Sequence, residues 1–303
     1  MSRILRKFNN RISGDYAQRL ATAFQELFTY RDDLSRINFK VALRKYFHLS
    51  IAPGNYPPVP YQFLCEQYGR ENGILDFGIF RLPQPNLANQ AIFMYEFIDL
   101  LAPFLFPGRV SPSTGVEGNY EQFGVGIEAG DIVIDAGANI GMFSVYAAAK
   151  DAQVYAFEPM PEPLQYLYKT RDINKTLSGS ITIVPLALTA ETGETEFVIP
   201  EDNISAASSI INRKGTTIVA ETITLDEWVE ENGLSNVDFI KADIEGSERD
   251  LLRGAQSVLK KFKPKLAICT YHHKDDPQVL ENIIRSTNSS YKIQHTSHKL
   301  FAY

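Results

Sequence analysis

The chain contains few cysteines, no long apolar run and no excess of basic charge. Only two of its 303 residues are cysteine, Cys65 and Cys269, and their wide separation indicates neither a disulfide framework nor a zinc site. The net charge of -6 argues against a general nucleic-acid binder, which is usually basic. The most apolar segment, residues 91–107, contains two acidic residues and two prolines, so it is too short and too charged to span a bilayer.

These absences predict a globular protein of a reducing compartment. No apolar signal core follows the basic residues near the N-terminus. A hydrophobic content of 44% and a charged content of 22% are typical of soluble domains. We therefore expect a cytoplasmic protein with no integral membrane segment and no nucleic-acid partner.

The sequence also lacks the Gly-x-Gly-x-x-Gly fingerprint of dinucleotide-binding folds. Residues 130–141 read Gly-Asp-Ile-Val-Ile-Asp-Ala-Gly-Ala-Asn-Ile-Gly, a β-branched run followed by a turn of small residues. The run predicts a buried parallel strand, and the turn lets backbone approach a ligand at the carboxyl end of that strand, where Asp135 can accept a hydrogen bond. A pyrophosphate needs more bare amides at the helix start. The turn therefore favours a nucleoside cofactor without a pyrophosphate, and S-adenosylmethionine fits that description.

A second acidic position follows at the distance expected of a nucleoside site. Residues 153–159, Gln-Val-Tyr-Ala-Phe-Glu-Pro, predict another short strand that ends in Glu158, 17 residues after Gly141. That spacing leaves room for one helix and a returning strand. An acidic residue at the end of the second strand is where a ribose hydroxyl pair is held in such folds.

The remaining pattern predicts two parts of different character. Residues 16–30 and 38–49 are expected to be helices of an N-terminal extension, and the stretch 108–120, rich in Gly, Ser and Pro, reads as a junction. From about residue 121 strands and helices alternate, with an antiparallel excursion and a closing antiparallel hairpin. Thr224, followed by Glu227, predicts a capped helix over 224–231. The expected strands are 132–135, 154–157, 181–188, 237–242, 265–269, 291–295 and 299–302, with the excursion around 195–223.

Four motifs together resemble one family. They are Val-Ile-Asp-Ala-Gly-Ala-Asn-Ile-Gly (133–141), Phe-Glu-Pro (157–159), Thr-Leu-Asp (224–226) and Val-Asp-Phe-Ile-Lys-Ala-Asp-Ile-Glu-Gly-Ser-Glu (237–248). The combination resembles the FkbM family of S-adenosylmethionine-dependent methyltransferases. The resemblance covers about residues 115–303 and implies a Rossmann-like class I α/β fold, with a mostly parallel sheet of about seven strands and one antiparallel strand near the edge. We accordingly expect a methyltransferase domain over 111–303 and a mainly helical N-terminal extension over 1–110.

The resemblance also assigns cofactor contacts. It implies that the turn after the first strand holds the methionine moiety, that Glu158 binds the ribose, and that the segment near Ala187 lies beside the adenine. Glu121, just before the first strand, is expected to reach the amino group of the cofactor. The full set of expected cofactor-binding residues is Glu121, Asp135, Ala136, Gly137, Asn139, Gly141, Glu158, Pro159 and Ala187.

The expected chemical half of the site follows the fourth and fifth strands. A base with a pKa near 7 suits removal of a hydroxyl proton, and His272 stands just past the strand 265–269, so we predict it to be the general base or a ligand of the substrate hydroxyl. Asp243 and Glu245 end the neighbouring strand. They can orient His272, bind substrate hydroxyls or ligate a divalent cation, or they can simply accept hydrogen bonds from loop amides. The spacing permits a metal but does not demand one.

The pattern and the resemblance together predict an S-adenosylmethionine-dependent O-methyltransferase acting on a hydroxyl of a sugar, a glycolipid or a natural product. The alternatives are an N-methyltransferase on the same fold, a nicotinamide-dependent oxidoreductase, and a binding module that has lost its chemistry. The expected partner is a small-molecule or glycan acceptor. Residues 1–110 are expected to act as a lid, a substrate contact or a dimer surface.

Overall fold

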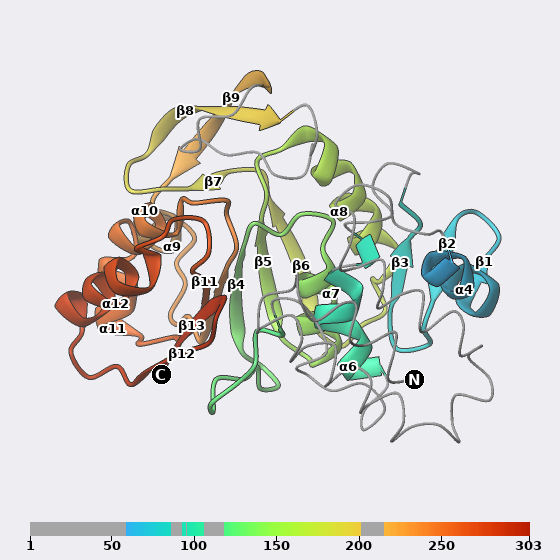
Figure 1. The fold of residues 1–303 in the computed structure, drawn as a ribbon, viewed down its shortest axis with the longest axis horizontal. Coiled ribbons are helices and arrows are strands. Elements are labelled where there is room, and N and C mark those ends of the chain that lie inside the picture. Colours follow the sequence, from blue (N-terminus) through green and yellow to red (C-terminus); the bar gives the residue numbers. More distant parts are fainter. Residues whose placement is uncertain (1–58, 86–92, 95, 106–117, 201–214) are drawn as a thin grey trace, which may run out of the picture.

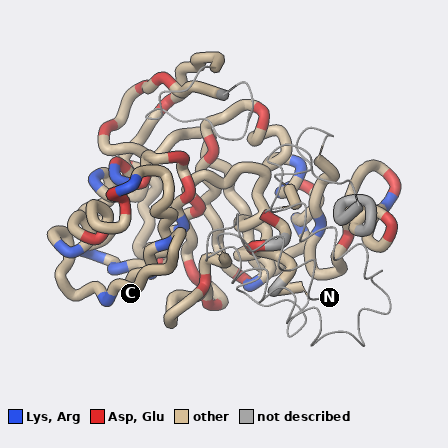
Figure 2. Tube along the Cα trace, viewed as in Figure 1, with Lys and Arg blue, Asp and Glu red and all other residues tan. Residues whose placement is uncertain are grey.

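The computed structural model describes residues 59–85, 93–94, 96–105, 118–200 and 215–303. The helices expected over 16–30 and 38–49, and the junction expected between the two parts at residues 110 and 111, lie outside the described residues. Acidic and basic residues are interspersed along the described chain (Figure 2). None of its helices combines the length and the apolar character needed to cross a bilayer.

A seven-stranded sheet forms the centre of the molecule (Figure 1). Its strand order is β12-β13-β11-β10-β4-β5-β6. Neighbours from β11 to β6 pair in parallel, whereas β13 runs antiparallel to both β11 and β12. The predicted fold class is therefore confirmed, including the one reversed strand beside the edge. The strands are β4 (Ile132–Ala136), β5 (Gln153–Phe157), β6 (Ser180–Val184), β10 (Phe239–Ala242), β11 (Lys265–Cys269), β12 (Ile293–His295) and β13 (Lys299–Ala302).

Both faces of this sheet are covered by helices, so its strands are apolar on both sides. Successive side chains point to opposite faces. Val133 and Val154 pack in one core and Ile134 in the other. Helices α7 (Met142–Ala149) and α8 (Pro161–Ile173) cover the first face. The second face is covered by α9 (Leu225–Glu231), α10 (Glu248–Arg253), α11 (Gln256–Lys261) and α12 (Asp276–Thr287).

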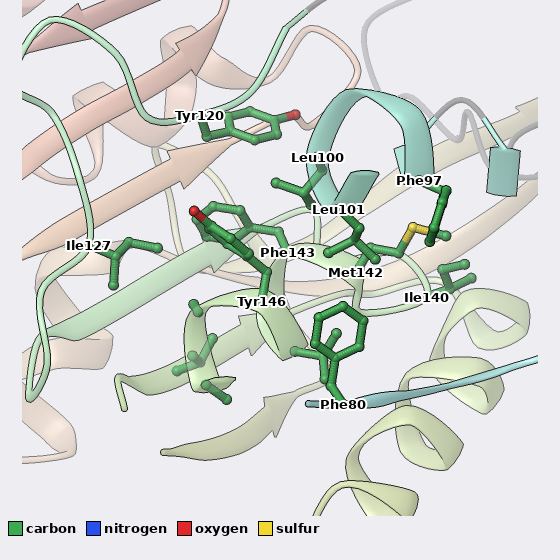
Figure 3. Packing of buried hydrophobic residues seen from close by; sticks show 14 of the residues in the cluster. Phe80, Phe97, Leu100, Leu101, Tyr120, Ile127, Ile140, Met142, Phe143 and Tyr146 are labelled. Atoms are coloured by element: carbon green, nitrogen blue, oxygen red, sulfur yellow. The ribbon is translucent and has the colours of Figure 1, made fainter. Parts of the chain in front are cut away.

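The described N-terminal segment contains a small three-stranded sheet in addition to helices. Three short strands follow α4. Turns of only three and four residues separate them, so neighbouring strands run antiparallel. The apolar side chains of this segment join the core beneath α7, as Phe80 and Phe97 do in Figure 3. The elements are α4 (Val59–Tyr68), β1 (Gly69–Arg70), β2 (Ile74–Asp76), β3 (Arg81–Pro83), the π-helix η3 (Phe97–Leu101) and α6 (Ala102–Leu105).

The expected antiparallel excursion is present as a third sheet. Strands β8 (Gly193–Pro200) and β9 (Gly215–Ile223) pair antiparallel, and β7 (Ala187–Leu188) pairs with β9. The single strand expected over 181–188 is thus two strands in two sheets. Pro185 lies between them and has no N–H to donate to a ladder. This break carries the chain from the central sheet to the excursion.

One side chain links the N-terminal segment to the sheet domain. Asn174 is buried at the end of α8, where its Oδ1 accepts from the backbone N–H of Arg81 at 2.8 Å and its Nδ2 donates to the carbonyl of Arg81 at 2.7 Å. We expect Asn174→Ala to lower the free energy of unfolding by about 2–3 kcal/mol, because it leaves backbone groups of β3 without partners. Urea denaturation measures this loss.

A matched control is Asn232→Ala, which removes one hydrogen bond to the carbonyl of Trp228 at the end of α9. It should cost about 1 kcal/mol or less. Equal losses for the two variants would contradict a special role for Asn174 in attaching β3.

Candidate functional site

A pocket of about 420 Å³ opens at the carboxyl ends of β4, β5 and β10. This volume lies within the range of small-molecule sites, roughly 300–1,000 Å³. The carboxyl edge is also where open α/β sheets bind ligands. Side chains from η3 and from the excursion close the pocket from other sides. Leu100, Tyr120 and Phe143, three of the lining residues, are labelled in Figure 3.

The end of β4 is fixed by a buried ion pair. Asp135 is fully buried, and Lys241 Nζ lies 3.0 Å from its Oδ1, while Ser144 Oγ donates to its Oδ2 at 2.6 Å. Burial lowers the pKa of Lys241, but Asp135 and Asp243 raise it overall, so the ammonium group stays charged. Lys241 also donates to the carbonyls of Ala136 and Gly137. Asp135 therefore lies beneath the turn and is not among the residues that line the pocket.

Backbone packing requires the glycine at 137, and a positive φ favours the glycine at 141. Gly137 has φ +72°, and a Cβ there would lie 2.0 Å from the carbonyl oxygen of Asp243. Gly141 has φ +89°, and a Cβ there would lie 2.6 Å from Leu167 Cδ1 in α8. Gly137 lines the pocket and Gly141 does not. The pattern of small residues thus reflects contacts between loops and helices as much as room for a ligand.

Glu158 follows β5 and faces the pocket. Its side chain accepts hydrogen bonds from the backbone N–H groups of Asn139 and Met160, both at 2.9 Å. Burial raises the pKa of Glu158 to about 7, although these two hydrogen bonds lower it. Beside it, Asn139 donates from Nδ2 to Glu96 at 2.7 Å. The Oδ1 of Asn139 is buried and has no hydrogen-bond partner among the described residues.

The other expected cofactor residues divide between the pocket and its surroundings. Ala136, Pro159 and Ala187 line the pocket. Glu121 does not: it accepts from Lys150 Nζ at 2.6 Å and from the N–H of Ile127. Because α7 leaves the carboxyl edge of the sheet and runs back, Lys150 after its end marks the opposite edge. The structure thus places Glu121 away from the pocket, in contrast to our expectation.

Asp243 occupies the wall across from Glu158. The hydroxyl of Tyr120 donates to its Oδ2 at 2.9 Å and the hydroxyl of Tyr271 to its Oδ1 at 3.2 Å. Burial raises the pKa of Asp243, but Lys241, His272 and Lys299 outweigh burial, so the pKa is lowered and the carboxyl is ionised at neutral pH. Glu245, two residues on, has φ +53° and also lines the pocket.

His272 lies behind this wall. Its side chain is 3% exposed, its Nδ1 is 3.1 Å from Glu248 Oε1, and its Nε2 is 3.7 Å from Glu245 Oε2 and 3.8 Å from Asp243 Oδ1. Burial lowers the pKa of His272, but the three carboxylates raise it to about 9. His272 is not among the residues that line the pocket. We expected His272 to be the general base or a ligand of the substrate hydroxyl; the structure places it behind the lining residues, beside Asp243.

Several lining residues were not expected from the sequence. Lys299, in β13, is 1% exposed, donates to the carbonyl of Gly118 at 3.0 Å and lies 4.5 Å from the centre of the Tyr120 ring. Glu96, the residue before η3, and Asp99 in η3 also reach the pocket. One sequence feature could have identified these residues, namely a charged side chain in apolar surroundings. Glu96 and Asp99 interrupt the most apolar segment of the chain, and Lys299 begins the buried strand Lys-Leu-Phe-Ala.

This fold and pocket define a class of protein. Within the described chain, a seven-stranded sheet with one reversed strand beside its edge, and a pocket at the carboxyl ends of its central strands, is the class I, Rossmann-like methyltransferase architecture. The model of the methyltransferase FkbM domain matches residues 135–292, more than half of the chain. The chain therefore belongs to the FkbM methyltransferase family, and the resemblance of its four motifs is confirmed.

Known relatives share part of their length with this chain. It is 27% identical over 168 residues to the hexuronic acid methyltransferase AglP of Haloferax volcanii, covering 55% of this chain and 66% of the relative. It is 25% identical over 171 residues to the 31-O-demethyl-FK506 methyltransferase FkbM of Streptomyces tacrolimicus, covering 46% and 65%. The chain thus matches just under two thirds of each relative. A crystal structure of methyltransferase FkbM from Methylobacillus flagellatus has a TM-score of 0.47 at 22% identity, covering 81% of this chain and 59% of that one.

The close packing of Gly137 against the carbonyl of Asp243 can be tested by substitution. We expect Gly137→Ala to lower the free energy of unfolding by roughly 3–4 kcal/mol, because the new methyl group adds a clash with the Asp243 carbonyl to the strain of a positive φ. Gly130→Ala is the control: Gly130 has φ +87°, but nothing lies within 4 Å of a Cβ there, so only about 1–2 kcal/mol of strain remains. Thermal unfolding of both variants measures the difference, and equal losses would contradict a tight contact.

Proposed function

We propose that this chain transfers a methyl group from S-adenosylmethionine to a hydroxyl group of a sugar, a glycolipid or a natural product. The observation that carries the proposal is Glu158, a buried carboxylate at the carboxyl end of β5 that lines the pocket beside the turn Gly137–Asn139. A carboxylate in this place is suited to accept hydrogen bonds from the two hydroxyls of a ribose. The buried Oδ1 of Asn139, which has no partner among the described residues, offers a further acceptor nearby.

The charges around the pocket support this cofactor over a dinucleotide. S-adenosylmethionine has a sulfonium and an ammonium group against one carboxylate, whereas a nicotinamide dinucleotide has a negatively charged pyrophosphate. Acidic side chains outnumber basic ones in the lining, which favours a cationic ligand. The acidic residues are Glu96, Asp99, Glu158, Asp243 and Glu245, and the basic ones are Lys241 and Lys299.

The apolar part of the lining suits a purine ring. Leu186, Ala187 and Leu188, around β7, line the pocket together with Phe157 at the end of β5. These side chains are beside Glu158, so a base placed among them would leave its ribose near the carboxylate. The placement of Ala187 beside the adenine, which the family resemblance implied, is part of this proposal.

The opposite wall supplies groups that can hold an acceptor hydroxyl. When bound, S-adenosylmethionine supplies a methyl group already activated by the positive charge on its sulfur. The protein must then align the acceptor oxygen with that methyl group, and such positioning can provide a large part of the rate. Asp243 and Glu245 can accept a hydrogen bond from the acceptor hydroxyl. The hydroxyls of Tyr120 and Tyr271 hold the Asp243 carboxylate in place.

The names of the relatives support a hydroxyl acceptor. One relative is called a hexuronic acid methyltransferase and another a 31-O-demethyl-FK506 methyltransferase, which specifies an oxygen. The second name is consistent with a wall that carries carboxylate acceptors, whereas the first does not say which atom is methylated.

The direct test is calorimetry with S-adenosylhomocysteine and with NAD, followed by methyl transfer from labelled S-adenosylmethionine to hexuronic acids and polyketide alcohols. We expect S-adenosylhomocysteine to bind and NAD not to bind, because the lining is rich in carboxylates. Binding of NAD without S-adenosylhomocysteine would refute the proposal. Transfer only to amine acceptors would refute its hydroxyl part.

The pKa of Glu158 generates a second prediction. Ribose hydroxyls donate to the ionised carboxylate, so binding favours that form, and affinity should fall as the pH drops through about 7, where the free protein takes up a proton. Between pH 8 and pH 6 we expect the Kd of S-adenosylhomocysteine to rise up to about 10-fold. Isothermal titration at several pH values measures the change.

Glu158→Gln is the matched variant because an amide has no charge to lose. It should bind S-adenosylhomocysteine more weakly at every pH and show a flat pH dependence. If the variant keeps the slope of the unchanged protein, another group is responsible and Glu158 does not hold the ribose.

A further inference from the structure

Three potential metal ligands converge behind the pocket wall. Asp243 follows β10, Glu248 begins α10, and His272 follows β11. One ligand atom from each lies within 4.8 Å of the other two. The elements that carry them are neighbours in the sheet or pack on it, so the cluster is built by the fold and not by one flexible loop.

Three buried polar atoms in this cluster, Glu248 Oε2 and both ring nitrogens of His272, have no hydrogen-bond partner among the described residues. Glu248 is fully buried, and although its Oε1 accepts from the N–H of Ile244 at 2.8 Å, its Oε2 makes no hydrogen bond within the described chain. The Nε2 of His272 is likewise buried and makes no hydrogen bond to any described residue. Buried polar groups are nearly always satisfied, so each such exception calls for a missing partner.

The cluster contains more acidic than basic side chains, which favours binding of a cation. Asp243, Glu245 and Glu248 surround a single imidazole, with Glu245 Oε2 3.7 Å from His272 Nε2. Two lysines also act on Asp243, but Lys241 is itself paired with Asp135 and Lys299 donates to the carbonyl of Gly118. Glu248 is fully buried, whereas the side chains of Asp243 and Glu245 are 25% and 28% exposed. A buried carboxylate such as Glu248 is normally paired or coordinates a metal.

We propose that Asp243, Glu248 and His272 bind one divalent transition-metal ion. A set of two carboxylates and one imidazole suits Mn²⁺, Fe²⁺ or Zn²⁺ better than Mg²⁺, which prefers oxygen ligands alone. Three protein ligands also leave positions for further ligands, as in catalytic metal sites.

The role of this ion depends on the proposed function, whereas its binding does not. Asp243 and Glu245 line the pocket, so the ion lies at the wall where the acceptor hydroxyl is expected. An ion there lowers the pKa of a hydroxyl bound to it, which would ease loss of the proton during methyl transfer. A metal binds the neutral imidazole, so coordination displaces the proton that His272 carries in the metal-free chain. This would give His272 a part in the reaction as a ligand and not as a base.

Metal titration of the full chain tests the proposal. The protein, free of any affinity tag and stripped with a chelator, is titrated with Mn²⁺ and with Zn²⁺ by calorimetry, and bound Mn²⁺ is counted by electron paramagnetic resonance. We expect one ion per chain. His272→Asn and Glu248→Gln should each weaken metal binding at least about 10-fold. Loss of a residue that only supports a metal ligand already weakens binding by roughly this factor, and loss of a ligand should cost at least as much. Asp243→Asn should do the same and keeps the test available if Glu248→Gln does not fold.

The control uses a second histidine–glutamate pair of the same chain. His295 Nε2 lies 2.7 Å from Glu281 Oε2 on the surface, far along the sheet from β10. His295→Asn should leave metal binding unchanged. No binding of Mn²⁺ or Zn²⁺ at millimolar concentrations would overturn the proposal, as would binding that persists in both His272→Asn and Asp243→Asn.

The same samples separate this proposal from the proposed function. S-adenosylhomocysteine is titrated in the presence and absence of the chelator. Binding of S-adenosylhomocysteine without any metal binding would refute the metal site and support the cofactor site. Metal binding without S-adenosylhomocysteine binding would refute the proposed function and support the metal site.

Discussion

The site depends on the ion pair between Asp135 and Lys241. The two residues are register partners on the adjacent strands β4 and β10, and both are buried. Removing one partner of such a pair leaves an uncompensated buried charge, which is strongly destabilising. The ammonium group also binds the carbonyls of Ala136 and Gly137, so the same cation that joins two strands sets the path of the turn. The carbonyl of Asp243 can then pack against Gly137, and the two walls of the pocket meet.

Much of the central sheet could be predicted because its signals are local. The β-branched run at 132–134 is long enough to mark β4, and Thr224 caps α9 by accepting from the N–H of Glu227, as the spacing indicated. The small N-terminal sheet could not be found in this way. Its strands have two or three residues, which is too short for an alternating pattern to show.

The candidate site was predictable in position and less so in the roles of its residues. Glu158 and Asn139 follow directly from the strand ends on which the prediction rested. The position of Glu121 depends on where the loop before β4 returns, and no motif encodes that path. The pKa of His272 is raised by three carboxylates that all lie within residues 243–248, so a rule based on its ordinary pKa could not anticipate this shift.

The pocket also joins distant parts of the chain. Glu96 reaches it from the residue before η3, Glu158 from the centre of the sheet, and Lys299 from the reversed strand β13. A ligand that touches all three contacts segments about 200 residues apart in sequence. Because it binds only when they are assembled, its binding free energy adds to the stability of the whole domain. A cell rich in this ligand would therefore hold more of the protein in its folded, protease-resistant form.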